Sequence, residues 1–279
     1  MADNDGVSSH EGPHQTTQAD NSVLARSFGA VAEQYSRLRP GYPTAALDVI
    51  CNAGPGRAGL ARAGIALDLA AGTGQLTGDL TDRGYRVVAV EPSAGMARQL
   101  RIRRPQALVV RGRAEQIPLP GGLVEVITVG QAFHWFSPEQ ALAEMARVCR
   151  PGGRVGLLWN ADDPADELSG GLQSSVRQLL GRKLPGEDSA AQQPQAPFAG
   201  STEFVDITRT VLPWTQRRTV AETQELFRTY SWVSTAPVSM QRRVDELIAT
   251  RLAGCPTDDR ARVASSQLCE VWSATRVPT

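Results

Sequence analysis

The chain has 279 residues, of which 41% are hydrophobic, and its 29 Lys and Arg residues balance its 29 Asp and Glu residues at a formal net charge of zero. This length and composition suffice for one large globular domain, and the neutral charge excludes strong bulk attraction to nucleic acid or to an anionic membrane. No apolar run reaches the roughly 20 residues of a membrane span, and the four cysteines lack the C-x-x-C spacing of a zinc site.

The N-terminal region divides into a polar segment and a predicted helix. Residues 1–22 are poor in apolar side chains and lack the basic and apolar regions of a signal peptide, so we expect a disordered tail and a cytoplasmic protein. A helix capped by Asn21-Ser22 should end before the rigid segment Arg39-Pro40-Gly41-Tyr42-Pro43. Its apolar side chains recur at helical spacing: Leu24, Phe28, Val31, Ala32 and Tyr35. Because this helix precedes the first strand, we expect it to act as a lid.

From Gly64 to Asn160, short apolar runs alternate with helix-compatible segments at intervals of roughly 20–25 residues. The predicted strands are Ile65–Ala70, Arg86–Val90, Ala107–Val110, Val124–Gly130 and Arg154–Trp159. The predicted helices are Thr44–Asn52, Leu76–Arg83, Ala94–Arg103 and Pro138–Arg150, the last stopped by Pro151-Gly152-Gly153. This alternation is typical of a parallel sheet with helices on both faces.

Beyond Asn160 the pattern weakens. We predict a helix over Glu167–Leu180, a loop over Gly186–Gly200, a strand over Phe204–Trp214, helices over Val220–Tyr230 and Met240–Ala253, and a closing antiparallel strand over Gln267–Val277. These segments favour helices and strands that complete the same domain.

The most informative segment is Asp68-Leu69-Ala70-Ala71-Gly72-Thr73-Gly74, which joins the first predicted strand to a helix. Gly72 and Gly74 lack side chains, so a bulky ligand can lie against the backbone there, and glycine adopts positive φ without steric cost. Glu91 ends the second predicted strand about twenty residues further on, where an acid can accept both hydroxyls of a ribose. The pattern indicates a nucleoside-type ligand at the ends of a parallel sheet.

Two alternatives bear on this interpretation. A dinucleotide-binding loop needs Gly or Ala at the position that Thr77 occupies. The acid Asp68 would also repel a pyrophosphate, whereas it suits a ligand that carries an ammonium group. A glycine turn after a strand also occurs in α/β proteins that bind no nucleoside.

The segment Asp68-x-Ala70-x-Gly72-x-Gly74 resembles the first motif of the class I S-adenosylmethionine (SAM)-dependent methyltransferases. Four further segments resemble motifs of the trans-aconitate and ubiquinone-biosynthesis methyltransferase-like subfamily: Phe28-x6-Tyr35-x3-Arg39-Pro40-x-Tyr42-Pro43, Glu91-Pro92-Ser93-x2-Met96, Arg113-Ala114-Glu115-x-Ile117-Pro118-Leu119, and Gly130-Gln131-Ala132-Phe133-His134-Trp135-Phe136. The resemblance covers residues 24–159, and from Ala161 onward only the order of the elements matches.

This resemblance implies a doubly wound α/β fold with a mostly parallel seven-stranded sheet, an antiparallel last strand and a helical lid. It divides the chain into a tail (1–22), a SAM-binding domain with its lid helix (23–160), and the substrate helices and closing strands of that domain (161–279). We expect SAM as the cofactor, S-adenosylhomocysteine as its product, and no metal.

The resemblance also implies the residues that bind the cofactor. They are Tyr35, Arg39, Asp68, Ala70, Gly72, Thr73, Gly74, Glu91, Pro92, Met96, Ala114, Glu115, Gln131 and Ala132. Many relatives carry an Asp just before the Ala-Glu pair, where it holds the adenine amino group. Arg113 stands there in this chain, so we expect the Ala114 backbone and the neighbourhood of Glu115 to contact the adenine.

His134 is the candidate catalytic residue, because the other two histidines lie in the predicted tail. It follows the fourth predicted strand, and an ordinary imidazole accepts a proton near neutral pH. The alternative is that it only shapes its loop. His134, Trp135, Tyr230 and Trp232 are candidate substrate contacts, although buried packing explains the aromatic residues equally well.

These observations predict methyl transfer to O, N or C of a small-molecule acceptor in biosynthetic or secondary metabolism, with no nucleic-acid or membrane partner. One alternative is an RNA or protein methyltransferase, which the neutral charge and the lack of a basic stripe disfavour. Another is a SAM-binding relative that does not methylate and instead regulates or catalyses a rearrangement.

Overall fold

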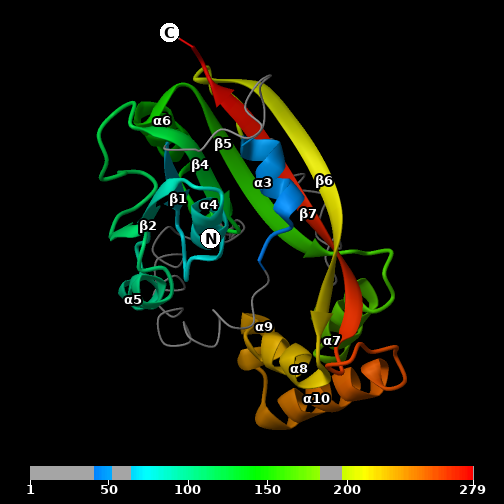
Figure 1. Ribbon diagram of the computed structural model, residues 1–279. Helices are drawn as coiled ribbons and strands as arrows, with labels where there is room; N and C mark the ends of the chain where they lie inside the picture. The colour runs from blue at the N-terminus through cyan, green and yellow to red at the C-terminus, as the bar shows by residue number, and fades with distance from the viewer. Residues whose placement is uncertain (1–40, 52–63, 183–196, 279) are drawn as a thin grey trace, which may run out of the picture.

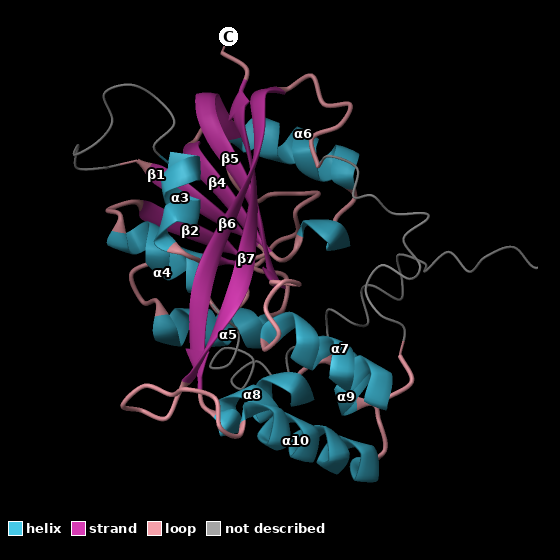
Figure 2. Cartoon of the chain, turned by 90° about the vertical axis from the view of Figure 1, so that its right-hand side faces the viewer, coloured by secondary structure: helices cyan, strands magenta, loops and turns pink. Residues whose placement is uncertain are grey.

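The computed structural model describes residues 41–51, 64–182 and 197–278, and they build one sheet with helices on both faces (Figures 1 and 2). The strands are β1 (Ile65–Leu69), β2 (Arg86–Val90), β3 (Leu108–Val110), β4 (Val124–Gly130), β5 (Cys149–Asp162), β6 (Phe204–Arg218) and β7 (Val263–Arg276). The sheet contains seven strands in the order β3-β2-β1-β4-β5-β7-β6. β3 to β5 are parallel, while β7 pairs antiparallel with both β5 and β6. The predicted α/β fold with an antiparallel last strand is therefore confirmed.

The helices are α3 (Thr44–Cys51), α4 (Gln75–Asp82), α5 (Ala94–Arg103), α6 (Pro138–Val148), α7 (Ser169–Leu179), α8 (Val220–Arg228), α9 (Ser231–Ser234) and α10 (Val238–Leu252), with a 3₁₀ turn, η1, over Phe133–Trp135. The predicted tail, the lid helix, Tyr35 and Arg39 lie outside the described residues, as does most of the predicted loop over 186–200.

Side-chain alternation along the central strands creates two cores. Leu67 and Leu69 of β1 point toward α6, and both are fully buried. Ala66, which precedes Leu67 and lies on the opposite face, packs with α3 and α4. Because helices cover both faces, these parallel strands are near-continuous apolar runs rather than alternating ones. The same alternation places Asp68 on the α4 face, beside Ala66 in the pleat.

The structure corrects the predicted boundary between the fourth helix and the fifth strand. α6 ends at Val148 rather than at Arg150, and β5 begins at Cys149 rather than at Arg154. Pro151-Gly152-Gly153 therefore lies within the strand, where the register with β4 shifts. Gly152 has φ of +70°. A glycine tolerates this conformation, so the strand bulges at a point where the sequence pattern predicted a stop.

The last two strands are longer than predicted. β6 runs to Arg218, four residues beyond the predicted end, and β7 begins at Val263. They pair from Phe204 with Arg276 to Arg218 with Val263, so each extends as far as its partner allows. The helix predicted over Val220–Tyr230 ends at Arg228 and is followed by the short α9.

Helices α7 to α10, here called the cap helices, lie beyond the ends of the central strands (Figures 1 and 2). They have an apolar core of their own, which includes Val176, Phe227, Val244 and Ile248. Along the chain, α7 follows β5, α8 follows β6, and β7 follows α10. The cap helices therefore face the carboxyl edge of β1, β2 and β4, where ligands bind in doubly wound sheets.

Candidate active site

The loop after β1 forms the centre of the carboxyl edge. Ala70, Gly72 and Gly74 have positive φ angles of 54°, 58° and 89°. No atom of the described residues lies within 4 Å of the point where a Cβ on Gly72 would stand. The space beside Gly72 is therefore open to a ligand, and its backbone conformation favours glycine. Thr73, the next residue in this loop, is buried and donates its hydroxyl to Gln75 Oε1 at 3.0 Å.

Asp68 lies beneath this loop rather than at its surface. The residue is only 1% exposed. Its carboxylate accepts the Thr77 hydroxyl at 2.6 Å and, more weakly, the Thr128 hydroxyl at 3.4 Å. Thr77 stands on α4 and Thr128 on β4, so Asp68, itself on β1, joins α4 to two strands. Asp68 is a predicted cofactor contact, and in the structure its carboxylate lies below the loop and is bonded to these two hydroxyls.

Burial raises the pKa of Asp68 to about 7, and the negative charge of Glu91 adds to this effect. The hydrogen bonds from Thr77 act in the opposite direction, because they stabilise the ionised form. This carboxyl group therefore changes its charge near neutral pH, directly below the glycine loop.

Glu91 joins the loops that follow β1 and β2. Its Oε2 accepts the Gly72 N–H at 2.8 Å and its Oε1 accepts the Ser93 N–H at 2.7 Å. The residue is 5% exposed, and this burial raises the pKa of its carboxyl group. Each carboxylate oxygen has a second lone pair, so both can still accept a hydroxyl. This geometry fits the ribose contact that the sequence predicts.

Pro92 directly precedes Ser93, the cap of α5, and Met96 lies in the first turn of this helix. The Pro92 carbonyl accepts a hydrogen bond from Arg111 at 2.7 Å. Met96 is buried, and its N–H is donated to the capping hydroxyl of Ser93 at 3.4 Å. Met96 thus helps to seat the helix on the sheet.

The loop after β3 carries Ala114 and Glu115. Ala114 is 4% exposed. Glu115 Oε1 accepts the backbone N–H of Ser137 at 3.0 Å, which ties this loop to the start of α6. Arg113, at the position where many relatives carry an acid, is mostly exposed and lies 3.8 Å from Glu115 Oε2.

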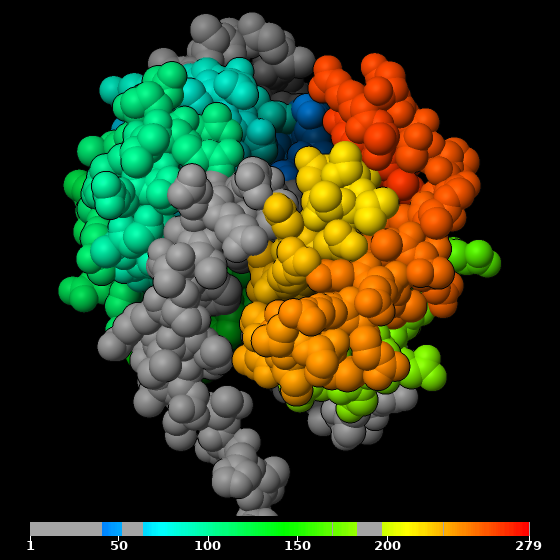
Figure 3. Space-filling view, turned by 90° about the horizontal axis from the view of Figure 1, so that it is seen from below, coloured from blue at the N-terminus to red at the C-terminus, as the bar shows by residue number. Residues whose placement is uncertain are grey.

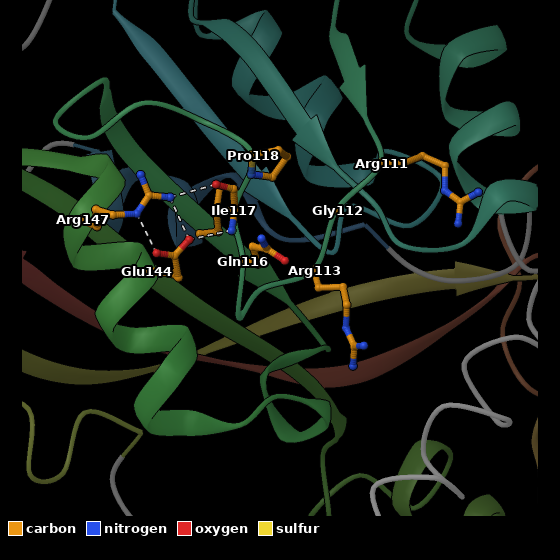
Figure 4. Close-up of a pocket in the computed structure, with 8 residues that line it drawn as sticks. All are labelled: Arg111, Gly112, Arg113, Gln116, Ile117, Pro118, Glu144 and Arg147. Atoms are coloured by element: carbon orange, nitrogen blue, oxygen red, sulfur yellow. Dashed lines mark hydrogen bonds and ion pairs between the residues drawn. The ribbon is translucent and has the colours of Figure 1, made fainter.

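Two residues that the sequence analysis missed hold this loop in place (Figure 4). Glu144 Oε2 accepts the Ile117 N–H at 2.7 Å, and Arg147 donates to the Ile117 carbonyl at 2.8 Å. Arg147 also donates to Leu119 at 2.8 Å and pairs with Glu144 at 2.6 Å. The Arg147 guanidinium lowers the pKa of Glu144, with the Ile117 N–H adding to this effect. The only sign of this role in the sequence was the spacing of Glu144 and Arg147, which places opposite charges three residues apart on a predicted helix.

Glu144, Arg147 and the loop that they hold line a cavity of about 480 Å³. Its lining residues are Arg111, Gly112, Arg113, Gln116, Ile117, Pro118, Glu144 and Arg147. Because Arg147 and Glu144 already bond to each other and to the loop, their charges serve to fix the loop rather than to attract a ligand.

The loop after β4 brings four predicted residues together. Gln131, with φ of 55°, donates its N–H to the Leu158 carbonyl and its side-chain amide to the Asn160 carbonyl, both at 2.8 Å. Ala132 is buried, whereas His134 and Trp135 on η1 are exposed. The His134 and Trp135 rings lie 4.8 Å apart. Partial desolvation lowers the pKa of His134.

Tyr230 and Trp232 lie within the cap helices. Their rings stack at 5.4 Å, nearly parallel, and the Arg177 guanidinium lies 4.6 Å from the Trp232 ring. Phe227 packs edge-on against both. This arrangement corresponds to the packing alternative for these residues, because it builds the core of the cap helices.

A metal-binding cluster and a membrane-spanning helix are both absent from the residues that the structure describes. No group of three or more His, Cys, Asp or Glu side chains there could hold a metal ion. Within the same residues, no helix is both long and apolar enough to cross a membrane.

A parallel sheet with an open glycine loop after β1, and a buried acid after β2 that braces this loop, defines a class I SAM-dependent methyltransferase. A family model described as a methyltransferase domain matches residues 67–157. An uncharacterized methyltransferase of Mycobacterium tuberculosis is 36% identical over 234 residues, which cover 82% of this chain and 88% of that protein. The chain therefore belongs to the methyltransferase family, and its activity depends on SAM.

Solved structures share the fold. A protein of Anaeromyxobacter dehalogenans classed among the methyltransferases matches with a TM-score of 0.65 and 23% identity, covering 86% of this chain and 99% of that one. A phosphoethanolamine N-methyltransferase of Haemonchus contortus, solved with phosphomonomethylethanolamine and S-adenosylhomocysteine, matches with a TM-score of 0.52 and 14% identity. That match covers 96% of this chain and 62% of the other. At these identities the matches support the fold alone.

Replacing Asp68 with Asn should change stability in a pH-dependent way. The pKa of about 7 in the folded state lies above 3.8, the ordinary value for an aspartate side chain, so between these values the folded state holds a proton that the unfolded state has lost. The contribution of Asp68 to the free energy of unfolding should therefore be largest near pH 4 and fall as the pH rises toward 7. Relative to the wild type, the Asp68→Asn variant should gain on the order of a few kcal/mol over this range.

Urea unfolding at pH 4.5 and 7.5 measures this difference. Asp82→Asn is the matched control, because Asp82 is an exposed acid at the end of α4. A difference between the Asp68→Asn variant and the wild type that is the same at both pH values would contradict a protonated, buried Asp68.

Proposed function

We propose that the protein transfers the methyl group of SAM to a small molecule held between the carboxyl edge of the sheet and the cap helices. The observation that carries this proposal is the position of the cap helices, which lie beyond the ends of the central strands in Figure 1 and include the yellow-to-orange helices that face the viewer in Figure 3. Such a cap suits an acceptor small enough to be enclosed, since methyl transfer needs a water-poor pocket.

The charges of the cap also favour a small molecule over RNA. α10 carries Arg242 and Arg243 followed closely by Asp245 and Glu246, so its charges are mixed in sign. The whole chain has no net charge. A nucleic-acid surface needs a continuous basic stripe, and this helix does not supply one.

The proposed cofactor site uses the residues of the carboxyl edge. Glu91 accepts the ribose hydroxyls, the open backbone at Gly72 lies against the nucleoside, and the loop from Ala114 to Ile117 holds the adenine. Asp68 supports this site from below through Thr77. When bound, SAM supplies an activated methyl group: the acceptor's lone pair forms the new bond to carbon while the carbon–sulfur bond breaks and its electron pair stays on sulfur.

The proton of the acceptor, where it has one, requires a base or solvent. His134 is our candidate, because it is the histidine on η1 directly after β4 and its lowered pKa keeps the imidazole neutral at physiological pH. The alternative is that His134 shapes η1 and that positioning alone drives transfer.

We place the reaction in biosynthetic or secondary metabolism, where small-molecule acceptors of this kind are modified.

The test of the function combines a cofactor variant with labelled methyl groups. Glu91→Ala should weaken SAM binding by about 2–4 kcal/mol, because it removes charge-assisted hydrogen bonds and loosens the glycine loop. Calorimetry measures this affinity, and Asp82→Ala serves as the control that removes an exposed carboxylate. An unchanged affinity in the Glu91→Ala variant would overturn the assignment of the cofactor site.

Wild-type protein with methyl-labelled SAM and a cell extract identifies the acceptor class. We expect label in the small-molecule fraction. Label in RNA or protein would replace this proposal with a macromolecular methyltransferase, and SAM binding without any transfer would favour the non-methylating alternative.

The role of His134 is tested by substitution and pH. If it is the base, His134→Ala should lower the rate by about 10²–10⁴-fold with little change in SAM affinity. The wild-type rate should fall at acid pH with a midpoint below 6.5, since desolvation lowers the pKa of this imidazole. His134→Gln, which keeps a hydrogen-bonding side chain without a basic nitrogen, should be as slow as the alanine variant. Recovery of activity in the glutamine variant would instead support the structural role.

A further inference from the structure

Three buried polar atoms on β5 and β6 have no hydrogen-bond partner. They are Asn160 Oδ1, Trp214 Nε1 and Gln216 Oε1, and none of them finds a partner in the structure as described. Gln216 is only 6% exposed as a whole residue. A buried acceptor or donor left unsatisfied costs roughly 1–3 kcal/mol, and such groups are rare in native proteins. Three of them on the two strands that flank β7 therefore require an explanation.

The strand register places all three on one face of the sheet. Asn160 pairs with Cys269 of β7, and Cys269 pairs with Leu212 of β6. Trp214 and Gln216 follow Leu212 at intervals of two residues, so their side chains point the same way. Directly opposed residues in an antiparallel ladder also share a face. The three unsatisfied atoms thus lie on one face of the sheet rather than at unrelated positions.

This surface continues the face that α3 covers further along the sheet. Ile50 of α3 packs closely on Gly156, and Leu158 and Val271 belong to the same apolar core. Beyond Leu158 the face becomes polar at Asn160. The change from apolar to polar occurs where β5 reaches its carboxyl end.

Two other polar groups of this surface do have partners. Gln267 donates its side-chain amide to Asp162 Oδ1 at 2.7 Å. The Asn160 side-chain amide is donated to the Gly41 carbonyl at 2.9 Å. These hydrogen bonds orient the side chains of Gln267 and Asn160. The unsatisfied atoms of Asn160, Trp214 and Gln216 lie beside these bonded groups.

The surface adjoins the proposed site of methyl transfer. Gln131, in the loop after β4, donates to the backbone carbonyl of Asn160 at 2.8 Å. Asn160 therefore stands beside the carboxyl edge of β4. Trp214 and Gln216 extend the surface from there across β7 to β6, toward the start of α8.

We propose that Asn160, Trp214 and Gln216 form the acceptor subsite, and that the acceptor is an uncharged small molecule bearing hydroxyl groups. This proposal rests on the proposed methyl transfer. Two amide oxygens need a donor and the indole N–H needs an acceptor, and a hydroxyl group can be either. An apolar acceptor would leave all three atoms unsatisfied, while a carboxylate would face two carbonyl oxygens that it cannot bond.

The charges around the subsite fit a neutral ligand. Asp162 is buried beside Gln267, and Arg218 lies near enough to stabilise its negative charge. Asp166 is a second acid near Asp162, so two carboxylates stand against one guanidinium and these charges disfavour an anionic acceptor. Selection should depend on hydrogen bonds, which discriminate strongly against analogues that lack the hydroxyl.

The test measures methyl transfer from labelled SAM to two panels of probes. One panel contains hydroxyl-rich compounds (simple sugars, polyols and catechols), and the other contains apolar compounds with one nucleophilic group (decanoic acid and decylamine). We expect transfer to the hydroxyl-rich panel. With the best of these probes, Gln216→Leu should raise KM at least 10-fold and Trp214→Phe several-fold, while calorimetry shows an unchanged affinity for SAM.

Thr215→Val is the matched control, because Thr215 lies between the two residues on the same strand but is exposed on the opposite face. It should change neither KM nor SAM affinity. The unfolding midpoint of Gln216→Leu should not fall, since the variant removes an unsatisfied acceptor. This measurement separates a binding defect from a folding defect.

Transfer only to the apolar panel would overturn the subsite, as would a wild-type KM in both Gln216→Leu and Trp214→Phe. Normal SAM binding without transfer to the hydroxyl-rich panel would also overturn it while leaving the cofactor assignment standing. Failure of the wild type to bind SAM would overturn the proposed function itself.

Discussion

The carboxylate of Glu91 is the contact on which the rest of the site depends. It accepts backbone N–H groups from two loops that belong to different strands, and thereby sets the spacing between the glycine loop and the start of α5. The sheet delivers it there, because the Ala71 N–H bonds to Val90 and the Glu91 N–H bonds to Val110. The ladder between the strands thus continues into the loops. A buried carboxylate with such defined partners costs desolvation, which the two N–H donors offset.

The parallel half of the molecule was largely predictable, since its strands are apolar runs with little alternation and its loops carry glycine. The position of Asp68 was harder to infer. Its place in the motif suggested a ligand contact, whereas the alternation of β1 directs its side chain toward α4 and Thr77. Thr128 is sixty residues away in sequence, and no local pattern links it to Asp68.

Other features depend on pairings that a single sequence does not display. Glu144 and Arg147 hold the loop after β3 through Ile117, although their spacing in the sequence suggested only a surface ion pair. The bulge at Gly152 depends on the register with β4, which involves a partner strand about 25 residues earlier. For the acceptor region, the motifs gave almost no guidance, because only the antiparallel pairing of β5, β7 and β6 places Asn160, Trp214 and Gln216 on one face of the sheet. Tyr230 and Trp232, for which the sequence left substrate contact and buried packing equally open, pack within the cap helices.

The order of strands also has a consequence for how the chain is made. β5 ends at Asp162, but its neighbour β7 begins only at Val263. During synthesis, β5 remains an edge strand with unpaired backbone groups until about a hundred more residues have been added, which takes on the order of 5–20 seconds. Such an edge can pair with another chain. The nascent protein is therefore most vulnerable to aggregation after its cofactor-binding half has emerged from the ribosome and before its C-terminus has been released.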